Sequence, residues 1–257
     1  MNRWTVILSL FPLLAAAAEP VAVKPVTAGI AEFTAACQAW DGARFATAVE
    51  WLRQASTNAP ASPTNFYWLG VAEFHRMLYL QNQPSPATNS DAAPGAMEAA
   101  LAALNRAVKL DPLHVESHAL LGTLYGMKID GNLVRAAWFG PRVEKHRKAA
   151  LELGANNPRV NYLLGTCQFH TAKKPAALRE ALATLLQAEK LFEAETRTTP
   201  GPLDPRWGHA SCLTFIGRTY EQLGQRKDAA DYYRKALARQ PSDHLAKEGL
   251  ARATAKQ

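Results

Sequence analysis

Cysteine, long apolar runs and catalytic signatures are all scarce in this sequence. Three cysteines among 257 residues cannot form a framework of several disulfides, although one bridge between two of them stays open. They are Cys37, Cys167 and Cys212. After residue 18, no segment approaches the roughly 18 consecutive apolar residues of a membrane-spanning helix, so we expect no span in the mature chain. The composition, 48% hydrophobic and 20% charged, excludes a disordered protein and leaves a globular body or an array of repeats.

Enzyme signatures are missing as well. The sequence has no G-x-S-x-G elbow, no H-E-x-x-H helix and no phosphate-binding G-x-x-x-x-G-K-S/T loop. Cys167 and His170 are residue types of a nucleophile and its base, but no orienting group accompanies them. We therefore predict a non-catalytic protein without a cofactor.

The net charge of +7 is scattered along the chain and is not concentrated in one basic segment. Lys and Arg alternate with acids, as in residues 226–240. Scattered charge of this kind is typical of solvated helix faces, whereas nucleic-acid binding requires a basic patch. We therefore expect no nucleic-acid partner and a mild preference for acidic ones.

The first residues have the features of an export signal. Arg3 precedes an apolar run over residues 4–14, and small residues follow. Ala16 and Ala18 fit an A-x-A cleavage site. We predict cleavage after Ala18, export to a bacterial periplasm, and a flexible linker over residues 19–29.

A pattern of small, large and small residues followed by proline occurs three times with the same spacing. The copies are Ala48, Leu52, Ala55 and Pro60; Ala100, Leu104, Ala107 and Pro112; and Ala229, Tyr233, Ala236 and Pro241. A leucine or isoleucine followed by glycine recurs at Gly70, Gly122, Gly165 and Gly217. Glycine and alanine let two helices approach closely, the large residue fills the gap to the next pair, and proline ends the second helix.

This pattern resembles the tetratricopeptide repeat, a helix–turn–helix unit of 34 residues. The resemblance implies an all-α, right-handed superhelical solenoid of about five units with a C-terminal capping helix. We place the units at about 30–60, 63–112, 115–155, 158–193 and 208–241, and the capping helix at 242–255. The third unit matches least well, because Val143 and Arg147 precede Ala150.

The spacing between the repeated glycines exceeds 34 residues, so we expect inserted segments. Residues 81–95 are polar and predict a surface loop. Residues 128–141 form a second insertion, which is apolar at Trp138 and Phe139. Residues 197–207 separate the fourth unit from the fifth.

Two nonapeptides, residues 67–75 and 162–170, both fit Y-x-L-G-x-x-x-F-H. Their histidines, His75 and His170, fall two units apart, which places them roughly 20 Å from each other and excludes a shared metal. We interpret the two segments as one structural unit used twice.

Two further pairs, Cys167 with His170 and His209 with Cys212, carry zinc-ligand types. They occupy opposite ends of neighbouring first helices, about 15 Å apart at the helical rise per residue. We therefore predict no metal site.

In tetratricopeptide arrays the first helices line the concave surface, so the resemblance implies a groove for a protein or peptide segment. Its apolar contacts would be Tyr67, Phe74, Met127, Tyr162 and Phe169; its orienting groups would be His75, His170 and Arg218. The alternative is that these aromatic residues pack between units.

The main hypothesis is an exported, non-catalytic adaptor that binds a partner in this groove. Its rival is a carrier of a small ligand or metal, accessory to an envelope transport system. The carrier would use a closed pocket between the groove and the segment with Trp138 and Phe139. A third hypothesis, an assembly factor acting through its convex face, stays open.

Overall fold

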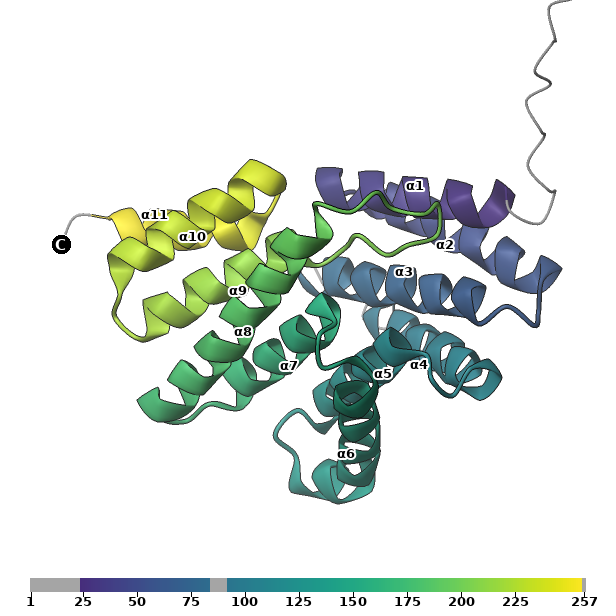
Figure 1. Cartoon of the computed structure of the whole chain (residues 1–257), viewed down its shortest axis with the longest axis horizontal. Coiled ribbons are helices and arrows are strands. Elements are labelled where there is room, and N and C mark those ends of the chain that lie inside the picture. The colour runs from purple at the N-terminus through teal and green to yellow at the C-terminus, as the bar shows by residue number, and fades with distance from the viewer. Residues whose placement is uncertain (1–23, 84–91, 256–257) are drawn as a thin grey trace, which may run out of the picture.

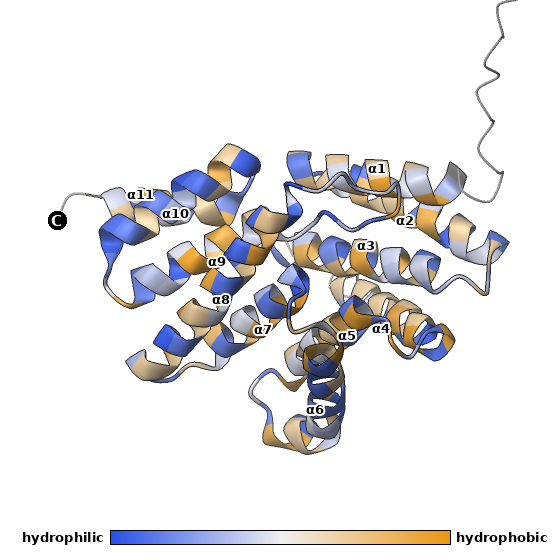
Figure 2. Cartoon of the chain, viewed as in Figure 1, coloured by the Kyte–Doolittle hydropathy of each residue, from blue (hydrophilic) through white to orange (hydrophobic). Residues whose placement is uncertain are grey.

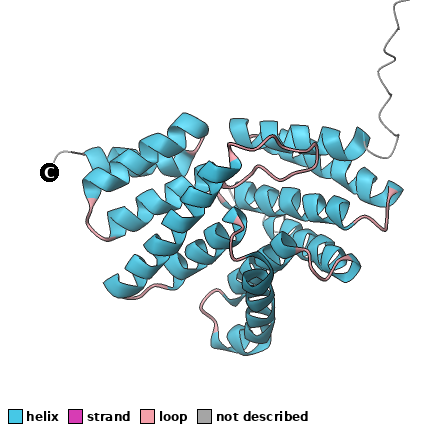
Figure 3. Cartoon of the chain, in the orientation of Figure 1, coloured by secondary structure: helices cyan, strands magenta, loops and turns pink. Residues whose placement is uncertain are grey.

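The computed structural model describes residues 24–83 and 92–255, and these residues form eleven α-helices and no strand (Figures 1 and 3). The helices are α1 (Lys24–Ala39), α2 (Gly42–Asn58), α3 (Pro63–Gln81), α4 (Ala92–Leu110), α5 (Val115–Ile129), α6 (Leu133–Gly154), α7 (Pro158–Thr171), α8 (Pro175–Glu195), α9 (His209–Gln222), α10 (Arg226–Arg239) and α11 (His244–Thr254). Consecutive helices pack as five antiparallel pairs, and α11 packs on the last pair. The prediction of an all-α solenoid of about five units with a capping helix is confirmed.

Several helix starts follow directly from local sequence. The side chain of Asp41 accepts hydrogen bonds from backbone amides at the start of α2, and Asn157 does the same for α7. Ser62 caps α3 through the amide three residues on. Pro63 and Pro158 occupy the first helical positions, where no donor is needed and the proline φ already suits a helix.

The predicted leader over residues 1–18 lies outside the described residues, and so does the middle of the predicted loop over 81–95. The predicted linker over 19–29 is wrong for residues 24–29, which are helical because α1 begins at Lys24. Val26 is already buried against the core, so apolar packing accounts for the early start of the helix. No helix within residues 24–83 and 92–255 combines the length and apolar character needed to cross a membrane.

In four of the five helix pairs, a large side chain from the second helix packs directly on a glycine of the first helix. A Cβ atom added at each glycine would lie 2.5–2.8 Å from that side chain, so only glycine permits the approach. The contacts are Gly29 with Leu52, Gly70 with Leu104, Gly165 with Leu185, and Gly217 with Tyr233. All four large residues are fully buried.

Helix α6 departs from this arrangement. A Cβ atom at Gly122 would meet no large apolar side chain, and its nearest neighbour would be the backbone nitrogen of Arg147 at 3.5 Å. Helix α6 also contacts the following helix much less than the other second helices do. It projects away from the rest of the molecule (Figure 1).

The predicted insertion over residues 128–141 is wrong, since α5 continues to Ile129 and α6 begins at Leu133. Gly140 and Pro141 suggested a break, yet the helix runs through them. Pro141 lies on the exposed side of α6, so water can reach the carbonyl that lacks an amide partner.

The two ends of the array meet. The turn between α10 and α11 lies against the C-terminal end of α1 (Figure 1). Gln38 donates to the carbonyl of Arg239 at 3.4 Å, and the rings of Trp40 and His244 are 5.5 Å apart. The solenoid therefore curves far enough for its first unit to touch its capping region.

Candidate functional site

Residues 196–208, between α8 and α9, cross the face formed by the first helices; we call this segment the interior strap (Figure 1). The indole nitrogen of Trp68 donates to the carbonyl of Leu203 at 3.0 Å. The indole nitrogen of Trp207 donates to the hydroxyl of Tyr67 at 2.8 Å. The strap therefore occupies the inner face of α3, where an open groove was expected.

The prediction that aromatic side chains line an open groove is wrong. Tyr67, Phe74, Tyr162 and Phe169 are all buried. Trp207 from the strap bonds to Tyr67 of α3, and its ring lies 6.5 Å from that of Tyr162 on α7. The alternative, in which these rings pack between units, describes the structure.

His75 and Met127 are half-buried and belong to the interior. The Nδ1 atom of His75 donates to the carbonyl of Val71 at 2.9 Å, and its ring lies 5.3 Å from Trp207. Burial lowers the pKa of His75 to about 4, so the ring is neutral at pH 7. Met127 packs against the main core. Neither side chain is placed to orient a partner.

Three predicted residues do come together where α7 meets α9. The guanidinium of Arg218 lies 5.0 Å from the ring centre of Phe169 and 4.9 Å from that of Phe215. The exposed ring of His170 is 5.5 Å from Phe215. Burial, with the Arg218 charge adding, lowers the pKa of His170. This cluster is a cation stacked on aromatic rings and not an open binding surface.

A buried polar cluster holds the strap in place. Arg159 on α7 is almost fully buried and donates to both carboxylate oxygens of Glu195, at 2.8 and 3.0 Å. It also donates to the carbonyl of Pro205 in the strap. Glu116 accepts from the hydroxyl of Tyr67, whose pKa is raised by burial and by that carboxylate. The buried charges are paired, which is the condition for keeping them inside a protein.

Within the described residues, the cysteine thiols are not activated, and the residues that could bind a metal are not grouped together. All three cysteines are free, and burial raises the pKa of Cys37, Cys167 and Cys212, which favours the unreactive thiol form. Within the described ranges, no three side chains of His, Cys, Asp or Glu come together as metal ligands would.

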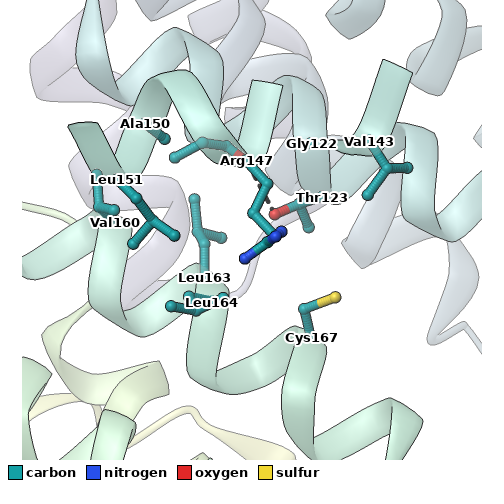
Figure 4. A pocket seen from close by; sticks show the side chains of 11 residues that line it. Gly122, Thr123, Val143, Arg147, Ala150, Leu151, Val160, Leu163, Leu164 and Cys167 are labelled. Carbon is teal, nitrogen blue, oxygen red and sulfur yellow. Dashed lines mark hydrogen bonds between the residues drawn. The ribbon is translucent and has the colours of Figure 1, made fainter. Parts of the chain in front are cut away.

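An apolar cleft opens between α5, α6 and α7 (Figure 4). The space in it that a water-sized sphere can enter is about 40 Å³, so the cleft is narrow and partly open to solvent. It is lined by Ala119, Gly122, Thr123, Val143, Arg147, Ala150, Leu151, Val160, Leu163, Leu164 and Cys167. Figure 4 shows the guanidinium of Arg147 extending across the cleft toward α7, above Cys167. Arg147 also donates to Glu144 on its own helix at 2.8–3.0 Å.

The cleft follows from the irregular third unit. Arg147 occupies the position at which the other second helices carry Leu52, Leu104, Leu185 or Tyr233. A charged side chain cannot be buried against Gly122 without a partner, so it stays at the surface. The buried Gly122 then faces the backbone of α6, and the space that a large apolar side chain would fill stays open as the cleft. The sequence carried this signal, because Val143 and Arg147 break the small–large–small pattern.

The beginning of α6 presents a second unusual surface, which we call the α6 tip: Leu133, Val134 and Trp138. The prediction that Trp138 and Phe139 line a closed pocket is wrong. Trp138 is 69% exposed, and Phe139 is half-buried with its ring stacked on Tyr125 at 6.0 Å. Both lie on a projecting helix, not on a loop folded over the interior.

The comparisons with known proteins agree with this architecture. The family profile of the tetratricopeptide repeat matches residues 210–253. The crystal structure of TTC0263, a thermophilic tetratricopeptide-repeat protein of Thermus thermophilus, is similar with a TM-score of 0.63 at 16% identity, covering 91% of this chain and 98% of that chain. The Cut9–Hcn1 hetero-tetramer of the APC/C is similar with a TM-score of 0.54 at 15% identity, covering 91% of this chain and 43% of that one. A search of curated proteins found no significant match. The chain thus carries a tetratricopeptide repeat and has the tetratricopeptide-repeat fold.

Proposed function

We propose that this chain is a non-catalytic interaction scaffold that binds a segment of a partner protein in the cleft between α5, α6 and α7. The observation that carries the proposal is the open apolar cleft at the one unit whose pattern is broken. In the other units the matching space is filled from within the chain. An uncovered apolar surface of this kind is the usual property of a binding groove.

The lining of the cleft indicates the chemistry of the bound segment. Its walls are almost entirely aliphatic and the space between them is small, so they suit one apolar side chain of the partner. The side chain of Arg147 at the mouth is 44% exposed, and its ion pair with Glu144 on the same helix is a weak surface pair. A carboxylate of the partner can replace Glu144 at little cost. We therefore expect a short motif that combines an apolar residue with an acidic one.

The state of the titratable groups supports a scaffold over an enzyme. The buried thiols of Cys37 and Cys212 are held in their protonated form. His75 and Arg159 are engaged in internal contacts. Among the residues that line the cleft, Arg147 carries the charge, and its role there is to attract and orient a partner.

The experiment is selection from a random peptide library, displayed on phage, against the purified chain. We expect enrichment of sequences that contain an apolar residue next to Asp or Glu. Binding of the enriched peptides should fall at least about tenfold in Arg147→Leu, which fills the cleft and removes the charge.

Arg234→Leu is the matched control for that variant. Arg234 is exposed and forms the same kind of pair, with Asp231 three residues earlier on α10, but lies far along the chain from the cleft. Its substitution should leave peptide binding unchanged. Equal loss in both variants, or no loss in Arg147→Leu, would place the binding surface elsewhere.

A carrier of a small apolar molecule is the second candidate, because the same aliphatic lining suits such a ligand. Native mass spectrometry of the protein as recovered from cells distinguishes the two. A retained small molecule that Arg147→Leu displaces would favour the carrier. Protein free of such a molecule, together with an enriched peptide motif, favours the scaffold.

We further propose that the scaffold acts after export, on the basis of the apolar N-terminal run and the A-x-A site at Ala16 and Ala18. N-terminal sequencing of protein from the producing cell is the test. A chain that begins at Glu19 supports export, whereas one that begins at Met1 contradicts it.

A further inference from the structure

The α6 tip gathers three large apolar side chains on the outside of the protein. Leu133 is 86% exposed, Val134 80% and Trp138 69%. The other exposed large apolar residues of the described chain, Trp51, Leu113 and Leu153, lie apart from the tip and from one another in the sequence. In Figure 2 the beginning of α6 is coloured as apolar and lies at the outer end of the projecting helix. This end of the helix stands clear of the solenoid body (Figure 1).

Cations surround these side chains. Val134, Trp138, Arg142 and Lys145 follow one another at helical spacing and therefore share one side of α6. Arg142 and Lys145 flank the apolar residues on that side, and the exposed Arg135 lies on the adjoining one. The guanidinium of Arg142 lies 5.8 Å from the ring centre of Trp138, which keeps positive charge directly beside the apolar group.

Negative charge near the tip is limited. Glu144 accepts hydrogen bonds from Arg147, and Glu98 is paired with Lys128 at 2.5 Å. Asp130, in the turn before α6, is the remaining carboxylate close in sequence. The tip also lies at the N-terminal, positive end of a 22-residue helix. The surface is therefore apolar and cationic at the same time.

We infer that the α6 tip docks onto the surface of an anionic lipid bilayer, with Trp138, Leu133 and Val134 inserted at the level of the headgroups. Tryptophan and aliphatic residues flanked by Arg and Lys are the composition that partitions into the membrane interface. Each cation near an anionic leaflet adds to the attraction. The projecting tip carries an open hollow beside Val134 and Trp138, and flexible lipid chains can fill such a hollow without a matching shape.

The docking surface and the cleft are separate parts of α6. Trp138 and Arg147 are nine positions apart in the sequence, which corresponds to about 13 Å along the helix axis. Docking at the tip thus leaves the cleft free, and the two proposals can fail independently of each other.

Co-sedimentation with lipid vesicles tests the inference. The full chain is mixed with vesicles of phosphatidylcholine alone, or of phosphatidylcholine with phosphatidylglycerol. The parent should bind the second kind and bind the first weakly. Leu133→Ser with Val134→Ser and Trp138→Ser should lower the partition coefficient on the anionic vesicles at least about tenfold.

Two further variants make the result specific. Trp51→Ser with Leu113→Ser removes exposed apolar groups from other parts of the chain and should bind like the parent. Arg135→Gln with Arg142→Gln and Lys145→Gln keeps the apolar groups. This variant should lose the binding to anionic vesicles and keep the weak binding to phosphatidylcholine vesicles. Circular dichroism checks that each variant is folded. If the serine variant does not fold, the charge variant alone provides the test.

Three results would overturn the inference. One is binding to anionic vesicles that the serine and charge variants leave unchanged. The second is equal binding of the parent to both kinds of vesicle, which contradicts the anionic requirement. The third is no vesicle binding by a parent that forms a dimer which the serine variant abolishes, since a second copy would then cover the tip.

Discussion

The third helix pair differs from the other four at Val143 and Arg147, and the apolar cleft accompanies the second of these differences. In the other pairs a leucine or tyrosine from the second helix covers a glycine of the first, and the large residue is fully buried. In the third pair Arg147 occupies that position and stays partly in solvent, so no large side chain covers Gly122, which faces the α6 backbone. Helix α6 keeps little contact with α7, and an apolar cleft lies between them.

The comparison shows how a repeat array acquires an open apolar cleft without adding a domain. Complete units use their apolar surface on one another and offer little to a partner. A unit with one charged residue in its packing position keeps the helices but not the contact between neighbours. Substitutions that remove the large residue from a complete unit, or add one to the third unit, therefore test this explanation directly.

Truncation of the large residue should separate the two kinds of unit most clearly. Leu185→Ala should lower the free energy of unfolding by about 3 kcal/mol, because it removes a fully buried side chain and leaves a cavity. Arg147→Ala, at the matching position, should change it by less than about 0.5 kcal/mol. Urea denaturation followed by circular dichroism measures both, and similar losses would show that the third unit is packed like the rest.

The glycines opposite these residues should respond with opposite signs. Gly165→Ala should destabilise by about 2 kcal/mol, because its Cβ would lie 2.7 Å from Cγ of Leu185 and 3.2 Å from the Leu185 nitrogen. Gly122→Ala meets nothing closer than 3.5 Å and should gain up to about 1 kcal/mol from helix propensity. Thermal or urea unfolding measures both variants, and a destabilised Gly122→Ala would show that the α6 backbone leaves no room for the methyl group.

A leucine at position 147 should make the third unit pack like the other four. Arg147→Leu should raise the free energy of unfolding by about 1 kcal/mol, since a leucine side chain can pack into the apolar cleft. The same variant should lose peptide binding. Arg147→Lys keeps a charge at the mouth and serves as the control, without a gain in stability. A less stable leucine variant would mean that the cleft is too narrow for the side chain.

The third unit should also contribute to acid sensitivity. Its His146 lies 2.9 Å from His118 between Nδ1 atoms, and Nε2 of His118 is 3.0 Å from the carbonyl of Pro112. A carbonyl only accepts, so Nε2 of His118 donates to it, and Nδ1 of His146 donates to the free Nδ1 of His118. Burial, with His118 and Lys145 adding, lowers the pKa of His146 to about 4.

The sign of the pH effect follows from that shift. An unfolded histidine binds its proton at about pH 6.5, so the unfolded state gains protons first as the pH falls. Stability should therefore decrease from about pH 6.5 to about pH 4, by about 1 kcal/mol per pH unit for His146. His146→Gln should reduce the slope by about that amount in urea titrations across the window. The exposed His170→Gln is the control and should reduce it less.

Most of the fold could be predicted from the sequence because the repeat pattern is local. A small–large–small spacing and a following proline identify a second helix without knowledge of its neighbours. One further copy, Ala181, Leu185 and Ala188 in α8, is equally buried but was not identified. Pro141 was misleading for the opposite reason, since an exposed proline does not end α6.

The candidate site was only half visible in the sequence. The break at Val143 and Arg147 identifies the unit that carries the cleft, but a pattern cannot show whether a gap is filled by another segment. The interior strap fills the expected groove through Trp207 and Tyr67, which are 140 positions apart. No window along the sequence contains both partners of such a contact.

The sequence by itself determined the helices, their pairing and the position of the irregular unit, because each depends on residues within one turn or one hairpin. Tertiary structure alone decided which apolar faces remain open. It brought the strap onto α3 and α7, closed the array between Gln38 and Arg239, and left α6 packed on α5 with little contact to α7. Burial depends on distant segments that arrive at the same place, so the aromatic residues expected to line a groove lie in the core, and the arginine that breaks the pattern lies at the edge of an open cleft.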